Sequence, residues 1–365
     1  MLTAHAVIDL AALRHNLARV RDYAPESQVL AVIKANGYGH GALAVAEALS
    51  TADAFAVARL EEALKLRKGG IEHPILLLEG VFDPGELGVA AAHGCEIGVH
   101  SMSQLEALER AHLHSPVTVW LKIDSGMHRL GVAPEQAAEF YQRLQKTPSV
   151  KNVVLMTHFA SADEPETGQT EAQLALFNQC TQTWQKDLRS LANSAAIIEN
   201  PEAQKDWVRP GVMLYGASPF ADKDAHELGL KPAMTLKTRV IAVRDLKAGG
   251  SVGYGATWQA TEDTRLVVVA MGYGDGYPRH APSGTPVMIN GKRYPIVGRV
   301  SMDMITVDIG DADIKEGDQV ILWGDNPTVD EIAMLCGTIG YELLCNITTR
   351  VVYHYIDSEN PAEVR

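Results

Sequence analysis

The sequence lacks several features that would point to other classes of protein. Its 365 residues contain only four cysteines, with neither a CxxC pair nor a metal-ligand spacing, so we expect free thiols and no metal site. The net charge of −13 argues against nucleic acid as a partner. No apolar run approaches ~18 residues, and the N-terminus has no basic segment followed by an apolar one. We therefore expect no signal peptide, no membrane association and a cytoplasmic location.

The first two thirds of the chain alternate short apolar runs with helical patterns rich in Ala, Leu and Glu. Such alternation is typical of a (β/α)8 barrel with parallel, buried strands. A strand in the first ten residues and a helix over Asp9–Arg21 are predicted to precede the barrel. The barrel strands are predicted at Val29–Ile33, Ala54–Ala58, Ile75–Leu78, Glu96–Val99, Val117–Ile123, Val153–Met156, Ser190–Ala192 and Trp207–Val208.

After about Pro232 the helical patterns nearly vanish, and one helical segment remains, at Val329–Cys336. Strands are predicted at Thr238–Ala242, Leu266–Ala270, Val287–Ile289, Tyr294–Val297, Ile305–Val307 and Gln319–Trp323. We therefore predict an α/β protein of two domains. A (β/α)8 TIM barrel spans residues 1–231, and a mostly antiparallel β domain spans 232–365, with which residues 1–10 pair.

A lysine stands at the end of the first barrel run, immediately before a glycine-rich turn. The segment from Ala31 to Gly41 reads AVIKANGYGHG, and a helical pattern begins at Ala42. A lysine held half out of water at this point can act as an amine nucleophile or form a Schiff base. Lys34 is therefore a candidate catalytic residue, with a solvated lysine at a strand end as the alternative.

The carboxyl ends of the strands carry function in barrels of this kind. The residues at these ends are Lys34, Arg59, Glu79, His100, Lys122, Asp124, His158, Asn193, Ser194, Arg209 and Gly211. The loops after strands seven and eight usually bind phosphate in this fold. Here they offer the hydroxyl of Ser194 and backbone N–H groups that are accessible because Gly211 has no side chain. Together with Lys34, these loops predict a cofactor that carries both an aldehyde and a phosphate. The alternative is that the loops are ordinary polar turns.

Arg209 bears on the kind of reaction, because arginine is a donor only. If it faces the pyridine nitrogen of such a cofactor, that nitrogen stays unprotonated and the ring is a weaker electron sink. This favours proton exchange at one carbon over transamination.

The second domain contains loops dense in glycine and aromatic residues. They are Gly253–Trp258, Gly272–Arg279 and Gly298–Asp303. Plain hairpins seldom have this composition, so we expect these loops to line a site. For Tyr254, which stands between two glycines, the alternative is a turn tyrosine that packs its ring.

These segments resemble the bacterial alanine racemases, pyridoxal-phosphate enzymes of fold type III, over nearly the whole chain. The resemblance rests on Ala31–Gly41, His128–Gly131, Arg209–Gly211, Gly253–Gly255, Gly272–Tyr277 and Ser301–Asp303. It implies interconversion of L-alanine and D-alanine, for peptidoglycan synthesis or alanine catabolism, with pyridoxal 5'-phosphate as cofactor. It also implies a head-to-tail homodimer in which the β domain of one chain caps the barrel mouth of the other.

The resemblance further implies roles for individual residues. Lys34 would hold the cofactor and act on the D-isomer, and Tyr254 of the partner subunit would act on the L-isomer. Lys122 would be carbamylated, as N6-carboxylysine, and would orient Arg129. The other cofactor-binding residues would be Tyr38, Arg129, His158, Asn193, Ser194, Arg209, Gly211, Val212 and Tyr341. Substrate contacts would come from Arg129, Met302, Asp303 and Tyr273.

Three other functions fit parts of the sequence. A metal-dependent hydrolase could use His100, a carbamylated Lys122 and His158 as ligands, but it leaves Lys34 and the glycine turn unexplained. A non-catalytic pyridoxal-phosphate carrier would lack the β domain and the tyrosine loop. A fold-related decarboxylase would be expected to have an acidic residue in place of Arg209.

Overall fold

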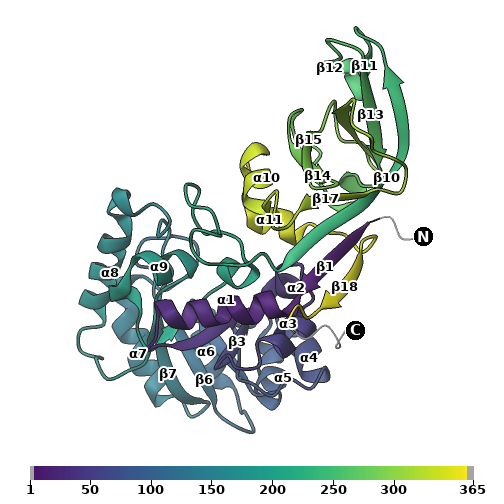
Figure 1. Cartoon of the computed structure of the whole chain (residues 1–365). Coiled ribbons are helices and arrows are strands. Elements are labelled where there is room, and N and C mark those ends of the chain that lie inside the picture. The colour runs from purple at the N-terminus through teal and green to yellow at the C-terminus, as the bar shows by residue number, and fades with distance from the viewer. Residues whose placement is uncertain (1–3, 360–365) are drawn as a thin grey trace. The chain divides into compact units, whose positions relative to one another are not determined.

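The structure is a computed structural model that describes residues 4–359. The chain divides into two compact units (Figure 1). One unit is Asn16–Leu214, and the other joins the chain up to His15 with the chain from Tyr215 onwards. The division falls within the first helix, α1 (Leu10–Tyr23).

The first unit is a closed barrel of parallel strands, which confirms the predicted fold class. β9 pairs with β2 in parallel, through Val29 and Val208, and so closes the ring. The barrel strands are β2 (Gln28–Val32), β3 (Ala54–Val57), β4 (Ile75–Leu77), β5 (Cys95–Val99), β6 (Val117–Lys122), β7 (Val150–Met156), β8 (Arg189–Ser190) and β9 (Trp207–Val208). Their apolar runs are nearly continuous because a parallel strand is covered on both faces.

Helices follow the strands and surround the barrel (Figure 1). They are α3 (Ala42–Ala48), α4 (Leu60–Lys68), α5 (Leu87–Ala92), α6 (Met102–Arg110), α7 (Ala137–Lys146), α8 (Gln169–Cys180) and α9 (Ser194–Glu199). α7 shows why they pack there. Ala137, Phe140 and Leu144 recur on one helical face and are all buried.

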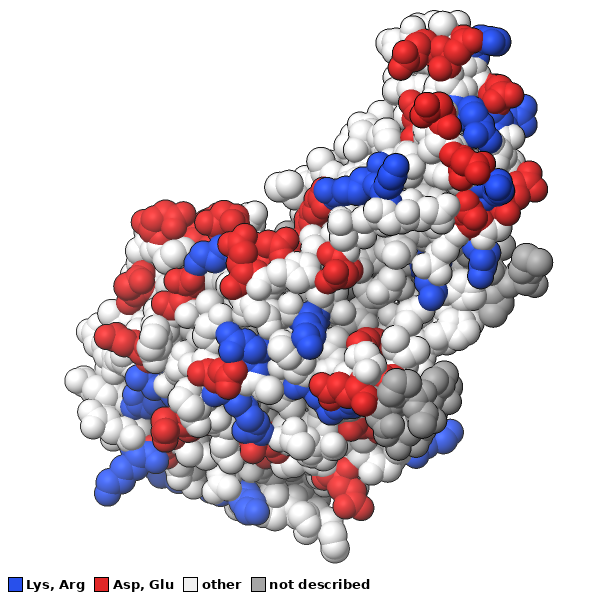
Figure 2. Space-filling view, in the orientation of Figure 1, with Lys and Arg blue, Asp and Glu red and all other residues white. Residues whose placement is uncertain are grey.

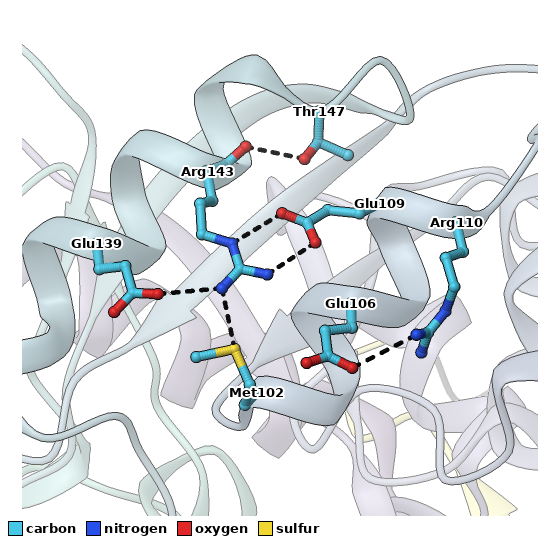
Figure 3. Close-up of polar contacts among 7 residues, drawn as sticks. All are labelled: Met102, Glu106, Glu109, Arg110, Glu139, Arg143 and Thr147. Carbon is cyan, nitrogen blue, oxygen red and sulfur yellow. Dashed lines mark hydrogen bonds and ion pairs between the residues drawn. The ribbon is translucent and has the colours of Figure 1, made fainter.

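A network of polar contacts joins α6 to α7 on the outside of the barrel (Figure 3). Arg143 of α7 makes two parallel bonds of 2.8 Å to the carboxylate of Glu109 on α6. It also contacts Glu139 at 3.0 Å and the sulfur of Met102 at 3.2 Å. A bidentate guanidinium–carboxylate pair fixes the geometry of its two helices more firmly than a single contact does.

The second unit contains an eight-stranded sheet in which β1 (His5–Asp9) pairs antiparallel with β10 and parallel with β18. β1 to β18 is the one parallel pairing of this sheet among the described residues, so the predicted antiparallel character is confirmed. The other strands are β10 (Met234–Leu246), β13 (Thr264–Val269), β14 (Pro286–Ile289), β15 (Lys292–Pro295), β16 (Ile305–Gly310), β17 (Gln319–Trp323) and β18 (Val352–Ile356), with a separate hairpin of β11 (Ser251–Val252) and β12 (Trp258–Gln259).

The elements of this unit that were not predicted include β18, the short strands β11 and β12, and the short helix α11 (Gly340–Cys345). The residues of β18 are all half-buried, so they lack the apolar alternation that signals a strand. The helix predicted at Val329–Cys336 is present as α10 (Val329–Leu335). After the barrel, the first strand of the sheet, β10, begins at Met234, close to the domain boundary predicted at 231 and 232, whereas the compact unit extends back to Tyr215.

The surface carries both signs of charge. Figure 2 shows acidic and basic side chains interspersed over the face in view. Among the described residues, no helix is both long enough and apolar enough to cross a membrane. The four cysteines are free thiols, as their spacing predicted.

Candidate active site

The backbone after Lys34 forms a turn of left-handed helix, α2 (Lys34–Tyr38). Ala35, Asn36 and Gly37 all have φ between 52° and 64°, and Tyr38 has φ of 48°. Each non-glycine residue in this region costs roughly 1–2 kcal/mol. The sequence predicted a tight glycine turn here but gave no sign that non-glycine residues share its conformation. Strained backbone of this kind gathers at functional sites, where the surroundings hold it in place.

His40 holds the end of this turn. It is fully buried, and its Nδ1 donates to the carbonyl of Tyr38 at 2.8 Å. Burial lowers the pKa of His40 to about 4, so the ring is neutral near pH 7 and Nδ1 carries its proton. Asn36 closes the turn from the other side, because its Oδ1 accepts from the N–H of Ala42 at 3.1 Å.

Tyr38, Ser194 and Gly211 come together beside this turn. The Tyr38 hydroxyl lies 2.7 Å from the point that a Cβ on Gly211 would occupy, so a side chain at 211 would displace it. The N–H of Gly211 donates to Ser194 Oγ at 2.9 Å. Asn193 caps α9 through its Oδ1, which accepts from Ala196, and Val212 is fully buried. The structure thus brings Tyr38, Ser194 and Gly211 together, three of the barrel residues predicted to bind phosphate.

Arg209, which is only 5% exposed, is held by several acceptors. Nη1 donates to Ser190 Oγ at 2.7 Å, and Nη2 donates to the carbonyls of Thr157 at 2.6 Å and Leu191 at 3.2 Å. Nη2 also lies 3.3 Å from His158 Nδ1. Burial lowers the pKa of Arg209 to about 10, so the guanidinium stays protonated at neutral pH. Burial, and then the charge of Arg209, hold the pKa of His158 well below its usual range.

Lys122 lies at the end of β6 within reach of several other cations. Burial lowers its pKa to about 8, and the charges of Arg209, Arg129 and Lys34 act in the same direction against that of Glu79. At neutral pH a minor but appreciable fraction of this amine is therefore unprotonated. A group of cations at one barrel mouth favours an anionic ligand.

The loop that carries Arg129 is organised by Asp124. One carboxylate oxygen of Asp124 accepts from the N–H groups of Gly126 and His128, both at 3.0 Å. Gly131, with φ of 143°, passes so close that a Cβ there would lie 2.6 Å from the Asp124 nitrogen. Arg129 itself is exposed.

The remaining rim residues do not form a metal site. Arg59 lies over the ring of Phe82, with its guanidinium carbon 5.7 Å from the centroid. His100 donates to the backbone carbonyl of Glu79 at 3.1 Å. Within residues 4–359 no three His, Cys, Asp or Glu side chains are grouped so that they could hold a metal ion.

In the second unit, Tyr254 stands on the β11–β12 hairpin and is 70% exposed. Gly253 and Gly255 flank it with φ of 71° and 76°, and a Cβ on Gly255 would lie 2.9 Å from Arg299 Nη1. The exposure is contrary to the alternative in which the tyrosine packs its ring within the β domain.

The loops of Tyr273 and Met302 lie against each other in the same unit. The N–H of Tyr273 donates to the carbonyl of Ser301 at 3.1 Å, and that of Gly274 donates to the carbonyl of Met302 at 2.8 Å. Met302 is 52% exposed. Two of the predicted substrate-binding segments, separate in the sequence, are therefore adjacent.

Arg350, which precedes β18, ties these two loops together. Its Nε lies 3.1 Å from Asp275, and its Nη2 donates to Asp303 at 2.8 Å. Tyr341, predicted to bind phosphate with the barrel residues, belongs to this unit and lies half-buried in α11.

Several residues that hold the candidate site were missed by sequence reasoning. Ser190 binds Arg209, and Arg350 binds Asp303. Gln173 of α8, buried, donates to the carbonyl of His158 at 3.1 Å. Glu62 binds the backbone beside Lys34. Nothing in the local sequence marks these contacts, because each joins segments that are distant along the chain.

Comparison with known proteins covers both units. The family described as alanine racemase, N-terminal domain, matches residues 8–219, and alanine racemase, C-terminal domain, matches residues 233–355. The chain is 54% identical over 357 residues to the alanine racemase of Vibrio cholerae, covering 97% of this chain and 99% of that protein. It is 54% identical over 360 residues to the biosynthetic alanine racemase of Escherichia coli, covering 98% and 100%.

Solved structures agree with these relatives. The biosynthetic alanine racemase of Pseudomonas aeruginosa aligns with a TM-score of 0.94 at 48% identity, over 97% of this chain and 99% of that one. The alanine racemase of Acinetobacter baumannii aligns at 0.93 and 44%, over 97% and 100%. These similarities confirm the predicted racemase activity. They argue against the hydrolase, carrier and decarboxylase alternatives. The chain belongs to the alanine racemases, enzymes that interconvert L-alanine and D-alanine.

Proposed function

We propose that this chain racemises alanine with pyridoxal 5'-phosphate bound at Lys34, and that Lys34 and Tyr254 are the two bases. Alanine racemases generally depend on this cofactor. The observation that carries the proposal for this chain is the position of Lys34, which shares the barrel mouth with Lys122, Arg129 and Arg209. A cofactor with a dianionic phosphate and a phenolic oxygen suits such a group of cations.

The residues beside Lys34 fit the phosphate. The glycine at 211 leaves room next to the Tyr38 hydroxyl, and Ser194 Oγ accepts from the Gly211 N–H, so the serine proton can point to another acceptor. We infer that Tyr38, Ser194, Gly211 and Val212 bind the phosphate, with Asn193 shaping the turn and Tyr341 adding a further contact.

The bound cofactor would withdraw electrons from the α-carbon of alanine and so acidify its hydrogen. The amine of Lys34 and the hydroxyl of Tyr254 each take or return that proton, from opposite sides of the carbon. Arg209 presents only donors, so a pyridine nitrogen that faces it stays unprotonated. His158, bound to Arg209 and neutral, keeps the guanidinium in that orientation.

The remaining predicted residues would hold the substrate. Arg129 binds anionic oxygens of the cofactor and substrate. Lys122 carries a carbamate that orients Arg129; its lowered pKa supports this, because only the neutral amine adds carbon dioxide. Met302, Asp303 and Tyr273 contact the substrate from the β domain.

We further propose that the enzyme is a cytoplasmic homodimer in which Tyr254 serves the barrel of the partner subunit. The exposure of Tyr254 in its own chain supports this arrangement. The E. coli and P. aeruginosa relatives are named as biosynthetic, which supports D-alanine supply, including supply for peptidoglycan, over alanine catabolism.

Mixing two inactive variants tests the proposal. Lys34→Ala lacks one base, and Tyr254→Phe lacks the other. After subunit exchange, a heterodimer of the two should contain one complete site and regain racemase activity. No recovery after verified exchange would mean that both bases come from a single chain.

A further inference from the structure

The carboxylate of Glu62 binds the backbone at two places in the barrel. Glu62 is the third residue of α4 and is half-buried. Its Oε1 accepts from the N–H of Ala35 at 2.6 Å. Its Oε2 accepts from the N–H groups of Ala58 and Arg59, at 2.9 Å and 3.2 Å. The bonds to Ala58 and Arg59 satisfy backbone N–H groups at the start of α4. The bond to Ala35 reaches a different segment of the chain.

The N–H of Ala35 belongs to the peptide bond that follows Lys34. When this N–H is fixed, the plane of the peptide and the ψ angle of Lys34 are fixed with it. Ala35 itself has φ of 52°, a strained conformation that the surrounding contacts must hold. A charge-assisted acceptor at 2.6 Å is a strong restraint of this kind.

The other end of the contact is rigid. Ala58 and Arg59 directly follow β3, which lies beside β2 in the barrel and pairs Leu30 with Ala54. Glu62 therefore fixes the position of the peptide after Lys34 relative to the end of a neighbouring buried strand.

We propose that Glu62 is a positioning residue for Lys34: its carboxylate locks the peptide after the lysine and so aims the amine at the cofactor and substrate. This rests on the proposed role of Lys34. The carboxylate is needed because it offers acceptors on both sides, whereas an amide presents an NH2 group to one of the two sets of N–H groups.

The test compares Glu62→Gln with Glu61→Gln in the holoenzyme. Glu61 precedes it on the same helix and is exposed, so the control removes the same charge at the same helix end. We expect Glu62→Gln to lower kcat by roughly 10- to 100-fold, the scale of a misplaced catalytic group, with a smaller change in KM. For a second measurement the cofactor is removed from each enzyme and added back briefly before borohydride reduction, which should then label Lys34 several-fold less in Glu62→Gln. Glu61→Gln should match the wild type in both measurements.

The outcomes separate this inference from the proposed function. If wild-type label is on Lys34 and Glu62→Gln behaves as the wild type, only the inference about Glu62 is overturned. Wild-type label on another lysine overturns both. If Glu62→Gln does not fold, Glu62→Asp is measured in the same way and should show the same losses. Failure of both variants to fold would give Glu62 a structural role and overturn the inference.

Discussion

Arg209 and His158 lie within hydrogen-bond distance, with Nη2 of the guanidinium 3.3 Å from Nδ1 of the imidazole. Because arginine can only donate, Nδ1 must accept, and the neutral ring carries its proton on Nε2. The pKa values of both groups agree with this assignment, since Arg209 stays protonated and His158 stays neutral at pH 7. The pair therefore has a fixed donor and a fixed acceptor.

We expect Arg209→Lys to destabilise the barrel. A lysine concentrates its donors on one nitrogen and cannot reach Ser190 Oγ and the carbonyls of Thr157 and Leu191 together. A buried polar group left without a partner costs roughly 1–3 kcal/mol, so the free energy of unfolding should fall by roughly 2 kcal/mol or more. Urea denaturation measures it. A fall of less than about 0.5 kcal/mol, the range of a neutral surface change, would contradict the network.

Because His40 is buried and neutral, the stability of the barrel should depend on pH. The pKa of His40 is about 4 in the folded chain and 6.5 as the ordinary value, so between these pH values the unfolded chain binds a proton that the folded chain does not. The free energy of unfolding should therefore fall as pH drops through this window, by up to about 1.4 kcal/mol per pH unit. The lowered pKa of His158 acts in the same direction.

Chemical denaturation over this pH range, on the wild type and His40→Gln, measures the effect. The variant should be less stable near pH 7 but should show a shallower slope. Asp330, in the other unit, works the opposite way: burial raises its pKa to about 6, so it adds stability as pH falls. An unchanged slope in His40→Gln would mean that His40 is not the titrating group.

Lys122 should carry a carbamate in the folded protein. Its pKa of about 8 leaves neutral amine available to attack carbon dioxide, with loss of one proton to solvent. Labelling with carbon-13 bicarbonate should give one carbamate NMR signal in the wild type that is missing in Lys122→Ala. A high-resolution map with a free amine and a chloride ion beside Arg129 would contradict the carbamate alone, whereas a free amine with no anion there would contradict any such role.

Much of the fold could be predicted because its signals are local. Continuous apolar runs mark the buried parallel strands, and even the two-residue strand at Trp207–Val208 was identified. Lys34 could be placed because an apolar run ends at it and glycines follow. The left-handed turn through Ala35 could not be predicted, because surrounding contacts rather than residue type impose that conformation.

The contacts that support the candidate site could not be predicted from the sequence either. Glu62 reaches Ala35 and Arg350 reaches Asp303 across long stretches of chain, so no periodicity or motif records them. β18 escaped prediction because it pairs with β1 from the opposite end of the sequence and its residues are half-buried.

In the proposed mechanism two bases act from opposite sides of the substrate, and Tyr254→Phe tests this most directly. The change keeps the ring but removes the exchangeable proton on one side, so racemisation should fall by ~10²-fold or more, the scale of a lost acid–base group. Tyr294→Phe, which removes a hydroxyl from β15 in the same unit, is the matched control and should remain active.

The decisive measurement is exchange of the α-hydrogen in deuterated water, followed separately from D-alanine and L-alanine with the Tyr254→Phe enzyme. Lys34 remains in this variant and serves the D-isomer in the proposed scheme. We therefore expect the α-hydrogen of D-alanine to exchange faster than that of L-alanine. Equal exchange from both enantiomers would mean that one base serves both sides, and the two-base account would be wrong.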